Sequence, residues 1–209
     1  MEPHQAVAVI EPVLEYLDYA GIAVFALSGA LVAAAKRQTL VTFVFFAVIT
    51  GVGGGTVRDL LIDAPVFWIE RNAILLICIA AALIVWALPQ RVWREQALLW
   101  LDAIGLAAYA TFGAAKGLAY GVAPLPAIAM GVLTACTGGI IRDVLTGEPS
   151  ILMRPELYVT AAALSAALMV ALLMLGMPSI PAGAIAALLG FSLRAGAIMK
   201  GWALPAYRR

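Results

Sequence analysis

The sequence predicts an all-α integral membrane protein with seven transmembrane helices, and three observations lead to this prediction. Of the 209 residues, 64% are hydrophobic and 12% are charged, and the mean hydropathy is +1.02. Soluble domains have about 45–50% apolar and about 25% charged residues. The apolar residues form long runs, and one sequence motif inside these runs occurs twice. A soluble enzyme or a nucleic-acid-binding protein is therefore not expected, and the net charge of +1 agrees.

Seven runs approach the roughly 20 mostly apolar residues that a membrane-spanning helix needs. The connections between them are short and contain proline, glycine or charged residues, so no separate soluble domain is expected. Residues 1–209 should form a single membrane domain. The expected spans cover about 13–35, 40–61, 72–88, 97–118, 123–145, 157–176 and 180–201.

The repeated motif indicates that the chain consists of two related halves. Residues 53–59 return as residues 137–143, at an offset of 84 (143 − 59 = 84), with two glycines and an Arg-Asp pair at matching places. Asp18 and Asp102 share this offset. A unit of three helices must insert in the opposite direction when it is repeated, which predicts an inverted repeat. The expected units are 13–88 and 97–176, followed by a seventh helix at 180–201.

The loop charges predict the orientation in the membrane. We call the face at the N-terminus side A and the opposite face side B. Side A has one basic loop residue, Arg71, whereas side B has eight. The positive-inside tendency puts side B in the cytoplasm, so the N-terminus is expected outside and the C-terminus inside. The side-B residues are Lys36, Arg37, Arg91, Arg94, Arg154, Lys200, Arg208 and Arg209.

Glycines interrupt the second and fifth expected helices. Each glycine costs about 1 kcal/mol of helix propensity relative to alanine, so both helices are expected to kink there. Backbone carbonyls freed by a kink need water, a neighbouring helix or a passing cation as partner. Tight helix packing is the alternative, because Gly51 and Gly55 form a small-xxx-small motif. If the freed carbonyls line an ion path, K⁺ or Na⁺ is expected near Gly54 and Gly139. The residues expected to line this path are Gly53, Gly54, Gly55, Thr137, Gly138 and Gly139.

Charged residues inside the spans are costly in lipid, at about 2.5–3.5 kcal/mol each at mid-bilayer, and most need a partner. Antiparallel neighbouring helices bring Asp18 to Arg58 near side A, and the second copy repeats this as Asp102 with Arg142 near side B. Such pairs either hold helices together or line a path. Asp59 and Asp143 follow these arginines and should point about 100° away from them, toward a water-filled path.

Two further polar residues are candidates for gating. Lys116 has Val32 as its counterpart in the first copy, so no repeat partner explains it. It is either a gate or voltage-sensitive element, or a side chain that reaches the side-A interface. Ser165 is a candidate donor to Asp143, although serines in membrane helices also bond their own backbone. One histidine and two distant cysteines make a metal site unexpected, and no cofactor is predicted.

These motifs together resemble the prokaryotic branch of the trimeric intracellular cation channel family. The matching segments are residues 53–59, residues 138–143 and the ending from Phe191 to Pro205, which contains Arg194 and Trp202. The resemblance implies a homotrimer in a bacterial inner membrane, in contact with lipids, with one K⁺- and Na⁺-conducting pore in each subunit. It further implies that the glycine-containing helices line the pore, that Lys116 acts in gating, and that an Asp143–Ser165 hydrogen bond accompanies closure.

Two other functions remain open from the sequence. A secondary transporter of a small neutral solute such as glycine would use the same inverted repeat with broken helices. A membrane scaffold, whose glycines only pack helices, fits the number of intramembrane charges least well. None of the three functions is enzymatic.

Overall fold

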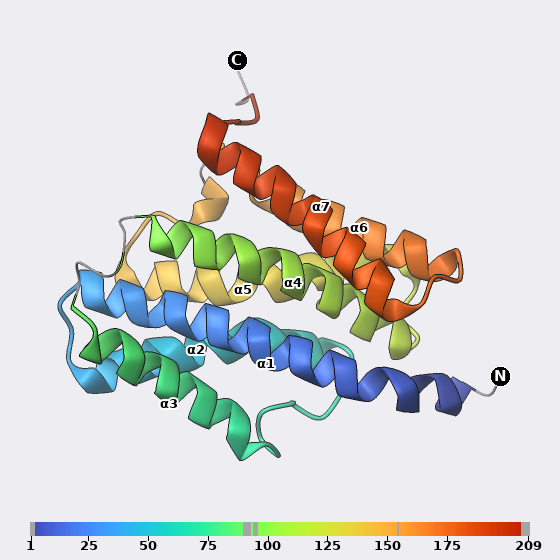
Figure 1. Ribbon diagram of the computed structural model, residues 1–209, viewed down its shortest axis with the longest axis horizontal. Helices are drawn as coiled ribbons and strands as arrows, with labels where there is room; N and C mark the ends of the chain where they lie inside the picture. The colour runs from blue at the N-terminus through green and yellow to red at the C-terminus, as the bar shows by residue number, and fades with distance from the viewer. Residues whose placement is uncertain (1–2, 90–92, 94–95, 154, 206–209) are drawn as a thin grey trace.

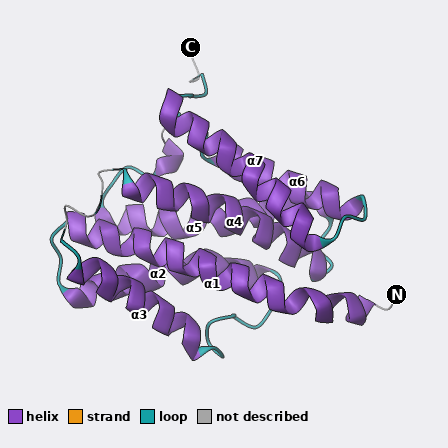
Figure 2. Ribbon diagram, in the orientation of Figure 1, coloured by secondary structure: helices purple, strands orange, loops and turns teal. Residues whose placement is uncertain are grey.

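The computed structural model describes residues 3–89, 93, 96–153 and 155–205, with side chains from Asp18 onward. Its regular structure is helical apart from one isolated backbone bridge between Glu156 and Ala203 (Figure 2). The described helices are α1 (Pro3–Ala35), α2 (Leu40–Leu61), α3 (Asn72–Ala87), α4 (Ala97–Ala119), α5 (Pro124–Thr146), the short η2 (Ile151–Met153), α6 (Val159–Met174) and α7 (Ser179–Lys200).

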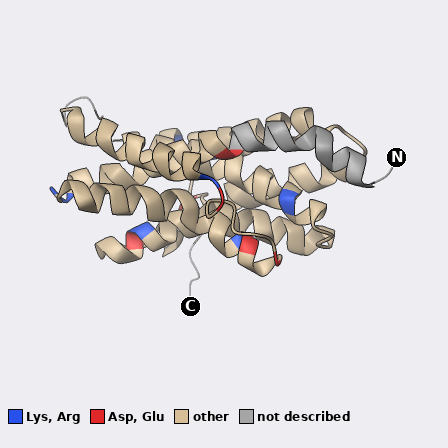
Figure 3. Cartoon of the chain, turned by 90° about the horizontal axis from the view of Figure 1, so that it is seen from below, with Lys and Arg blue, Asp and Glu red and all other residues tan. Residues whose placement is uncertain are grey.

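The α-helices follow the expected spans closely. Five of them are long and apolar enough to cross a membrane, whereas α3 and α6 are apolar but only 16 residues long. The clearest difference is at the start, because α1 begins at Pro3 rather than near residue 13. Lysine, arginine, aspartate and glutamate occupy only short sections of the ribbon (Figure 3). The chain is therefore an integral membrane protein.

The two halves use the same set of helix contacts. In the first half α1 contacts α2 and α3, and in the second half α4 contacts α5 and α6. The halves meet where α1 lies against α4 and where α2 crosses α5, while α7 rests on α4 and α6 (Figure 1). The core is rich in alanine, so the backbones lie close together.

A reciprocal glycine–aromatic contact joins α1 to α4. A Cβ atom on Gly21 would lie 2.0 Å from the ring of Tyr109, and a Cβ on Gly105 would lie 3.0 Å from the ring of Phe25. Tyr109 follows Phe25 by 84 residues, and Gly105 follows Gly21 by the same number. The two rings meet edge to face, with centroids 5.3 Å apart. Each half thus supplies a glycine that receives the aromatic ring of the other.

A second reciprocal contact holds α2 against α5 at the repeated glycines. A Cβ on Gly54 would lie 2.0 Å from the carbonyl oxygen of Thr134, and a Cβ on Gly138 would lie 2.4 Å from that of Thr50. Both helices continue without interruption through these glycines, so the unwound turn that would free carbonyls is not formed. Gly54 and Gly138 therefore serve the tight packing that the sequence left as the alternative. A bend of either helix at this point remains a prediction.

The predicted orientation rests largely on residues outside the described part of the chain. Arg91, Arg94, Arg154, Arg208 and Arg209 lie there, and the structure contains no membrane. The ends of α1 and α5 and the start of α4 nevertheless come together at one end of the bundle, as expected for side B. We keep the names side A and side B for the two ends.

Candidate ion path and its two mouths

The side-A cluster is centred on the buried carboxylate of Asp59 in α2. Its Oδ1 accepts a hydrogen bond from Arg58 Nε at 2.8 Å and lies 2.8 Å from Lys116 Nζ of α4. Its Oδ2 accepts a hydrogen bond from the backbone N–H of Phe67 at 3.1 Å. Both carboxylate oxygens are therefore occupied, one by two bases and one by the loop after α2.

Arg58 and Asp59 pair with each other, which corrects the expectation that the acid points away from its arginine. Arg58 Nη2 lies 2.8 Å from Asp59 Oδ1, because the long guanidinium side chain reaches back across the helix surface. The guanidinium also faces the Phe112 ring, at 4.9 Å from the centroid. Asp18 instead accepts a hydrogen bond from the hydroxyl of Tyr109 at 3.0 Å. The expected Asp18–Arg58 pair is not among the ion pairs of the described residues.

The side-B cluster is centred on Arg142 of α5. Its Nη1 lies 3.0 Å from Asp102 Oδ1 and donates to Ser28 Oγ at 3.2 Å, and its Nη2 lies 2.9 Å from Asp143 Oδ1. The sequence had paired Asp102 with Arg142. Asp143 Oδ2 accepts from the backbone N–H of Ile151 at 3.1 Å, in the manner of Phe67 at side A (151 − 67 = 84).

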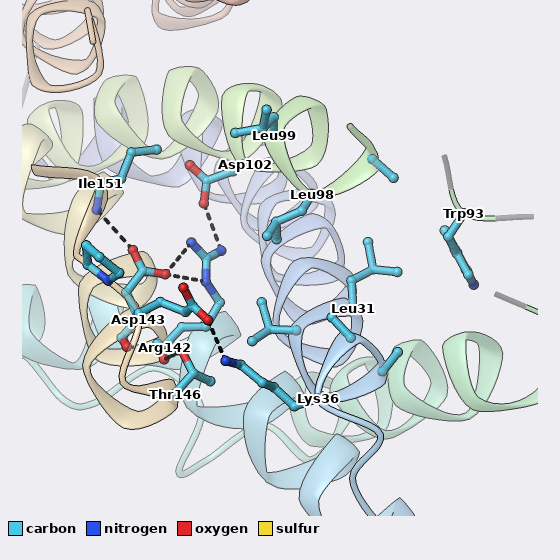
Figure 4. Close-up of a pocket in the computed structure, with 16 residues that line it drawn as sticks. Leu31, Lys36, Trp93, Leu98, Leu99, Asp102, Arg142, Asp143, Thr146 and Ile151 are labelled. Carbon is cyan, nitrogen blue, oxygen red and sulfur yellow. Dashed lines mark hydrogen bonds and ion pairs between the residues drawn. The ribbon is translucent and has the colours of Figure 1, made fainter. Parts of the chain in front are cut away.

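A cavity of about 320 Å³ opens at side B beside this cluster (Figure 4). Asp102, Arg142 and Asp143 lie on its wall, together with Val32 of α1 and Thr146 of α5. The remaining lining is mainly apolar and comes from the end of α1, the start of α4 and the loop after α5: Leu31, Ala34, Ala35, Lys36, Trp93, Ala97, Leu98, Leu99, Glu148, Pro149 and Ile151.

The two mouths differ in formal charge because of one substitution between the copies. Side A has two bases, Arg58 and Lys116, opposite two acids, Asp18 and Asp59. The side-B core has one base, Arg142, opposite two acids. Lys116 takes the place of Val32, which lines the side-B cavity (116 − 32 = 84). The side-A cluster thus has no net formal charge and contains a lysine, whereas the side-B cluster has a net negative formal charge and lies beside a cavity.

Ser165 does not form the expected hydrogen bond with Asp143 in the structure. A Cβ on Gly190 of α7 would lie 1.7 Å from Ser165 Oγ, so this serine packs against α7. Asp143 takes its partners from Arg142 and Ile151. The Ser165 hydroxyl is buried and forms no hydrogen bond in the structure.

The other glycine-region residues lie on different sides of their helices. Gly55 faces the ring of Phe67, which a Cβ would approach to 2.5 Å, whereas Gly53 faces the flexible tip of Ile141 at 3.1 Å and the Cα of Gly138 at 3.8 Å. Gly139 lies between Tyr158 and Asp102, near the side-B cluster. Thr137 donates to the Leu133 carbonyl of its own helix at 2.6 Å. The described residues contain no group of three or more His, Cys, Asp or Glu suited to a metal ion.

Sequence reasoning missed three parts of this arrangement: the Tyr109 hydroxyl on Asp18, the loop N–H groups of Phe67 and Ile151, and the partner of Lys116. A signal existed for the loops, because Pro65 and Pro149 are also 84 residues apart and mark the same turn in both copies.

Comparison with known proteins places this arrangement in a family. A family model described as glycine transporter matches residues 15–90 and again residues 99–174, which are 84 residues apart (99 − 15 = 84). A crystal structure of the TRIC trimeric intracellular cation channel orthologue from Rhodobacter sphaeroides has 42% sequence identity and a TM-score of 0.84, covering 91% of this chain and 99% of that one. The chain belongs to the prokaryotic branch of the trimeric intracellular cation channel family.

Further relatives, one of them a solved trimeric intracellular cation channel (TRIC), resemble the chain over most of its length. A prokaryotic TRIC channel crystallised in 0.5 M KCl has 28% identity and a TM-score of 0.84, with 93% of this chain and all of that one covered. The inner membrane protein YadS of Escherichia coli is 40% identical over 149 residues, 70% of this chain and 72% of YadS. The membrane protein YvgT of Bacillus subtilis is 38% identical over 155 residues, 72% of this chain and 76% of YvgT.

Proposed function

We propose that this chain is a cation channel of a bacterial inner membrane, conducting K⁺ and Na⁺ through a path in each subunit of a homotrimer. Solved relatives are described as trimeric cation channels, and YadS is described as an inner membrane protein. We further propose that the N-terminus lies outside, that the C-terminus lies in the cytoplasm, and that the two halves form an inverted repeat. The reciprocal contacts of Gly21 with Tyr109 and of Gly105 with Phe25 support the repeat.

The observation that carries the proposal is the negative cavity at side B. Two carboxylates, Asp102 and Asp143, lie on its wall with one arginine between them. In a wall of low dielectric constant such an excess of negative charge attracts a cation more strongly than it would in water. The path continues from this cavity along α2 and α5 toward Asp59 at side A.

The path is closed at two points in this conformation. Lys116 occupies Asp59 at side A, and α2 touches α5 at Gly54 and Gly138. Withdrawal of Lys116 would leave Arg58 opposite Asp18 and Asp59, and side A would then match the charge of side B. A charge-assisted hydrogen bond contributes about 1.5–3 kcal/mol, which corresponds to about a 10- to 150-fold bias toward the closed state.

Recording from planar bilayers tests the proposal. The purified protein, first shown to be a trimer by native mass spectrometry, should give unitary currents whose reversal potential follows the K⁺ gradient. An Asp143→Asn variant should conduct less at low salt and approach the unmodified protein at high salt, because screening weakens fixed charge. The absence of unitary K⁺ currents from a folded trimer would contradict the proposal.

A glycine carrier is the second candidate function, and two observations favour it. The matching family model is described as glycine transporter. The side-B cavity also offers both an acid, Asp143, and bases, Arg142 and Lys36, which suit the two charges of an amino acid. Proteoliposomes discriminate between the candidates: saturable uptake of radiolabelled glycine without unitary currents would establish the carrier, and currents without saturable uptake would establish the channel.

A further inference from the structure

An ion pair that the repeat does not require lies on the partly exposed edge of the side-B cavity. Lys36 Nζ, just after α1, meets Glu148 Oε1, just after α5 (Figure 4). Both residues line the cavity, and their side chains are 43% and 47% exposed. The pair therefore lies between the cavity and the solvent at side B, and it joins the first half of the chain to the second.

This ion pair exists at only one of the two mouths. The counterpart of Glu148 is Ala64, and the counterpart of Lys36 is Tyr120 (148 − 84 = 64; 36 + 84 = 120). Neither counterpart can form an ion pair. Side A therefore relies on Lys116 and Asp59, whereas side B has a pair of its own.

Lys116 and Lys36 nevertheless occupy similar positions, near the end of the first helix of each half. The counterpart of Lys116 is Val32, and Lys36 follows Val32 by four residues, which is one turn along the same face of the helix. Each half thus carries a lysine near the end of its first helix, and each lysine reaches an acid of the other half: Lys116 reaches Asp59, and Lys36 reaches Glu148.

The backbone on both sides of the mouth is held by hydrogen bonds. The N–H of Lys36 donates to the Val32 carbonyl at 3.1 Å, and that of Gln38 donates to the Ala33 carbonyl at 3.0 Å. The N–H of Glu148 donates to the Asp143 carbonyl at 3.0 Å, beside Gly147, whose φ of 67° ends α5. The backbone that carries Lys36 and the backbone that carries Glu148 are therefore both anchored, and the two residues meet through their side chains.

We propose that Lys36 and Glu148 form a second gate, which controls entry of ions and small solutes to the side-B cavity independently of Lys116. Exposed ion pairs are weak and are screened by salt, so this gate opens readily and opens further as ionic strength rises. Loss of either charge should increase entry about two- to five-fold, in line with the strength of exposed pairs. The effect on current rests on the proposed channel function, but entry to the cavity does not.

Thiol labelling measures this entry directly. Thr146→Cys places a reporter on the cavity wall, and its reaction with a neutral methanethiosulfonate is followed by mass spectrometry of the purified protein. The native Cys78 and Cys136 are buried, and the protein without the reporter supplies the background rate. Lys36→Gln and Glu148→Gln, each combined with the reporter, should both increase the labelling rate. Arg37→Gln is the matched control, because this neighbouring exposed base does not line the cavity.

The direction of the two effects distinguishes a gate from a simple change of charge. A gate predicts the same increase for Lys36→Gln and Glu148→Gln, near-normal labelling when Lys36→Glu is combined with Glu148→Lys, and a rate that rises with salt only when the native pair is present. Rates that do not change, or that change in opposite directions for the two single variants, would overturn the second gate. Increased labelling in a protein without K⁺ currents would support the gate and reject the channel.

Discussion

Alanine at Gly54 tests whether the repeated glycines hold α2 and α5 together or provide flexibility. A Cβ at this position would lie 2.0 Å from the backbone carbonyl oxygen of Thr134, which has no flexible end to move aside. At Gly53, one residue earlier in the same helix, a Cβ would lie 3.1 Å from the terminal methyl of Ile141 and 3.8 Å from the Cα of Gly138, which is an ordinary van der Waals distance. Gly53→Ala is therefore a matched control with the same change in helix propensity.

The size of the effect follows from two opposing contributions. Both substitutions gain about 1 kcal/mol of helix propensity. Gly54→Ala also forces the helices apart, and overpacking of this kind costs about 1–3 kcal/mol. The two variants should thus differ by about 1–3 kcal/mol in the free energy of unfolding, with Gly53→Ala the more stable. For a chain of this size that corresponds to a difference of roughly 2–12 °C in Tm.

Thermal unfolding of the two purified variants in the same detergent measures this difference. Gly138→Ala should behave like Gly54→Ala, because its Cβ would lie 2.4 Å from the carbonyl oxygen of Thr50. Equal Tm values for Gly53→Ala and Gly54→Ala would contradict a packing role for Gly54, since glycines that serve only as flexible points make no such distinction between neighbours.

Two further predictions concern the two charge clusters, and a third concerns the contact between α2 and α5. Asp102→Asn should destabilise the protein by about 1.5–3 kcal/mol, because it removes one of the two acidic partners of the buried Arg142; urea unfolding in detergent measures this, and a change below 1 kcal/mol would contradict the pairing. Tyr109→Phe should cost about 1–3 kcal/mol through the lost hydrogen bond to Asp18, and an unchanged Tm would show that this bond contributes nothing. Gly138→Leu should alter unitary conductance or open probability while native mass spectrometry still finds trimers; unaltered currents would remove Gly138 from the ion path.

Much of the helical framework could be predicted, because apolar runs and short connections determine where helices begin and end. The bounds of α2, Leu40–Leu61, match the expected 40–61, and those of α4 differ from expectation by one residue. The helix α1 begins before the expected span of 13–35, because Pro3 tolerates the first turn of a helix and the polar residues after it do not prevent the helix from continuing. The repeat of 84 residues was also predictable, and the family model matches twice at that spacing.

The partners inside the site were less predictable, because they depend on how helices cross. Spacing indicates which face of α2 carries Gly54, but not that the carbonyl of Thr134 lies against it. Likewise, the 100° rotation between Arg58 and Asp59 describes their Cβ directions and ignores the reach of a guanidinium. The partner of Lys116 could have been found from charge balance, since side A has one more base than side B at equivalent positions.

We propose that Lys116 closes the ion path at side A, where its Nζ lies 2.8 Å from the Asp59 carboxylate. Single-channel recording of Lys116→Gln in planar bilayers tests it most directly, with Asp59→Asn and the double variant recorded under the same conditions. We expect the ratio of open to closed times to rise about 10- to 150-fold in Lys116→Gln with altered voltage dependence, and Asp59→Asn to add little to this rise. An unchanged open probability and current–voltage relation in Lys116→Gln would contradict it.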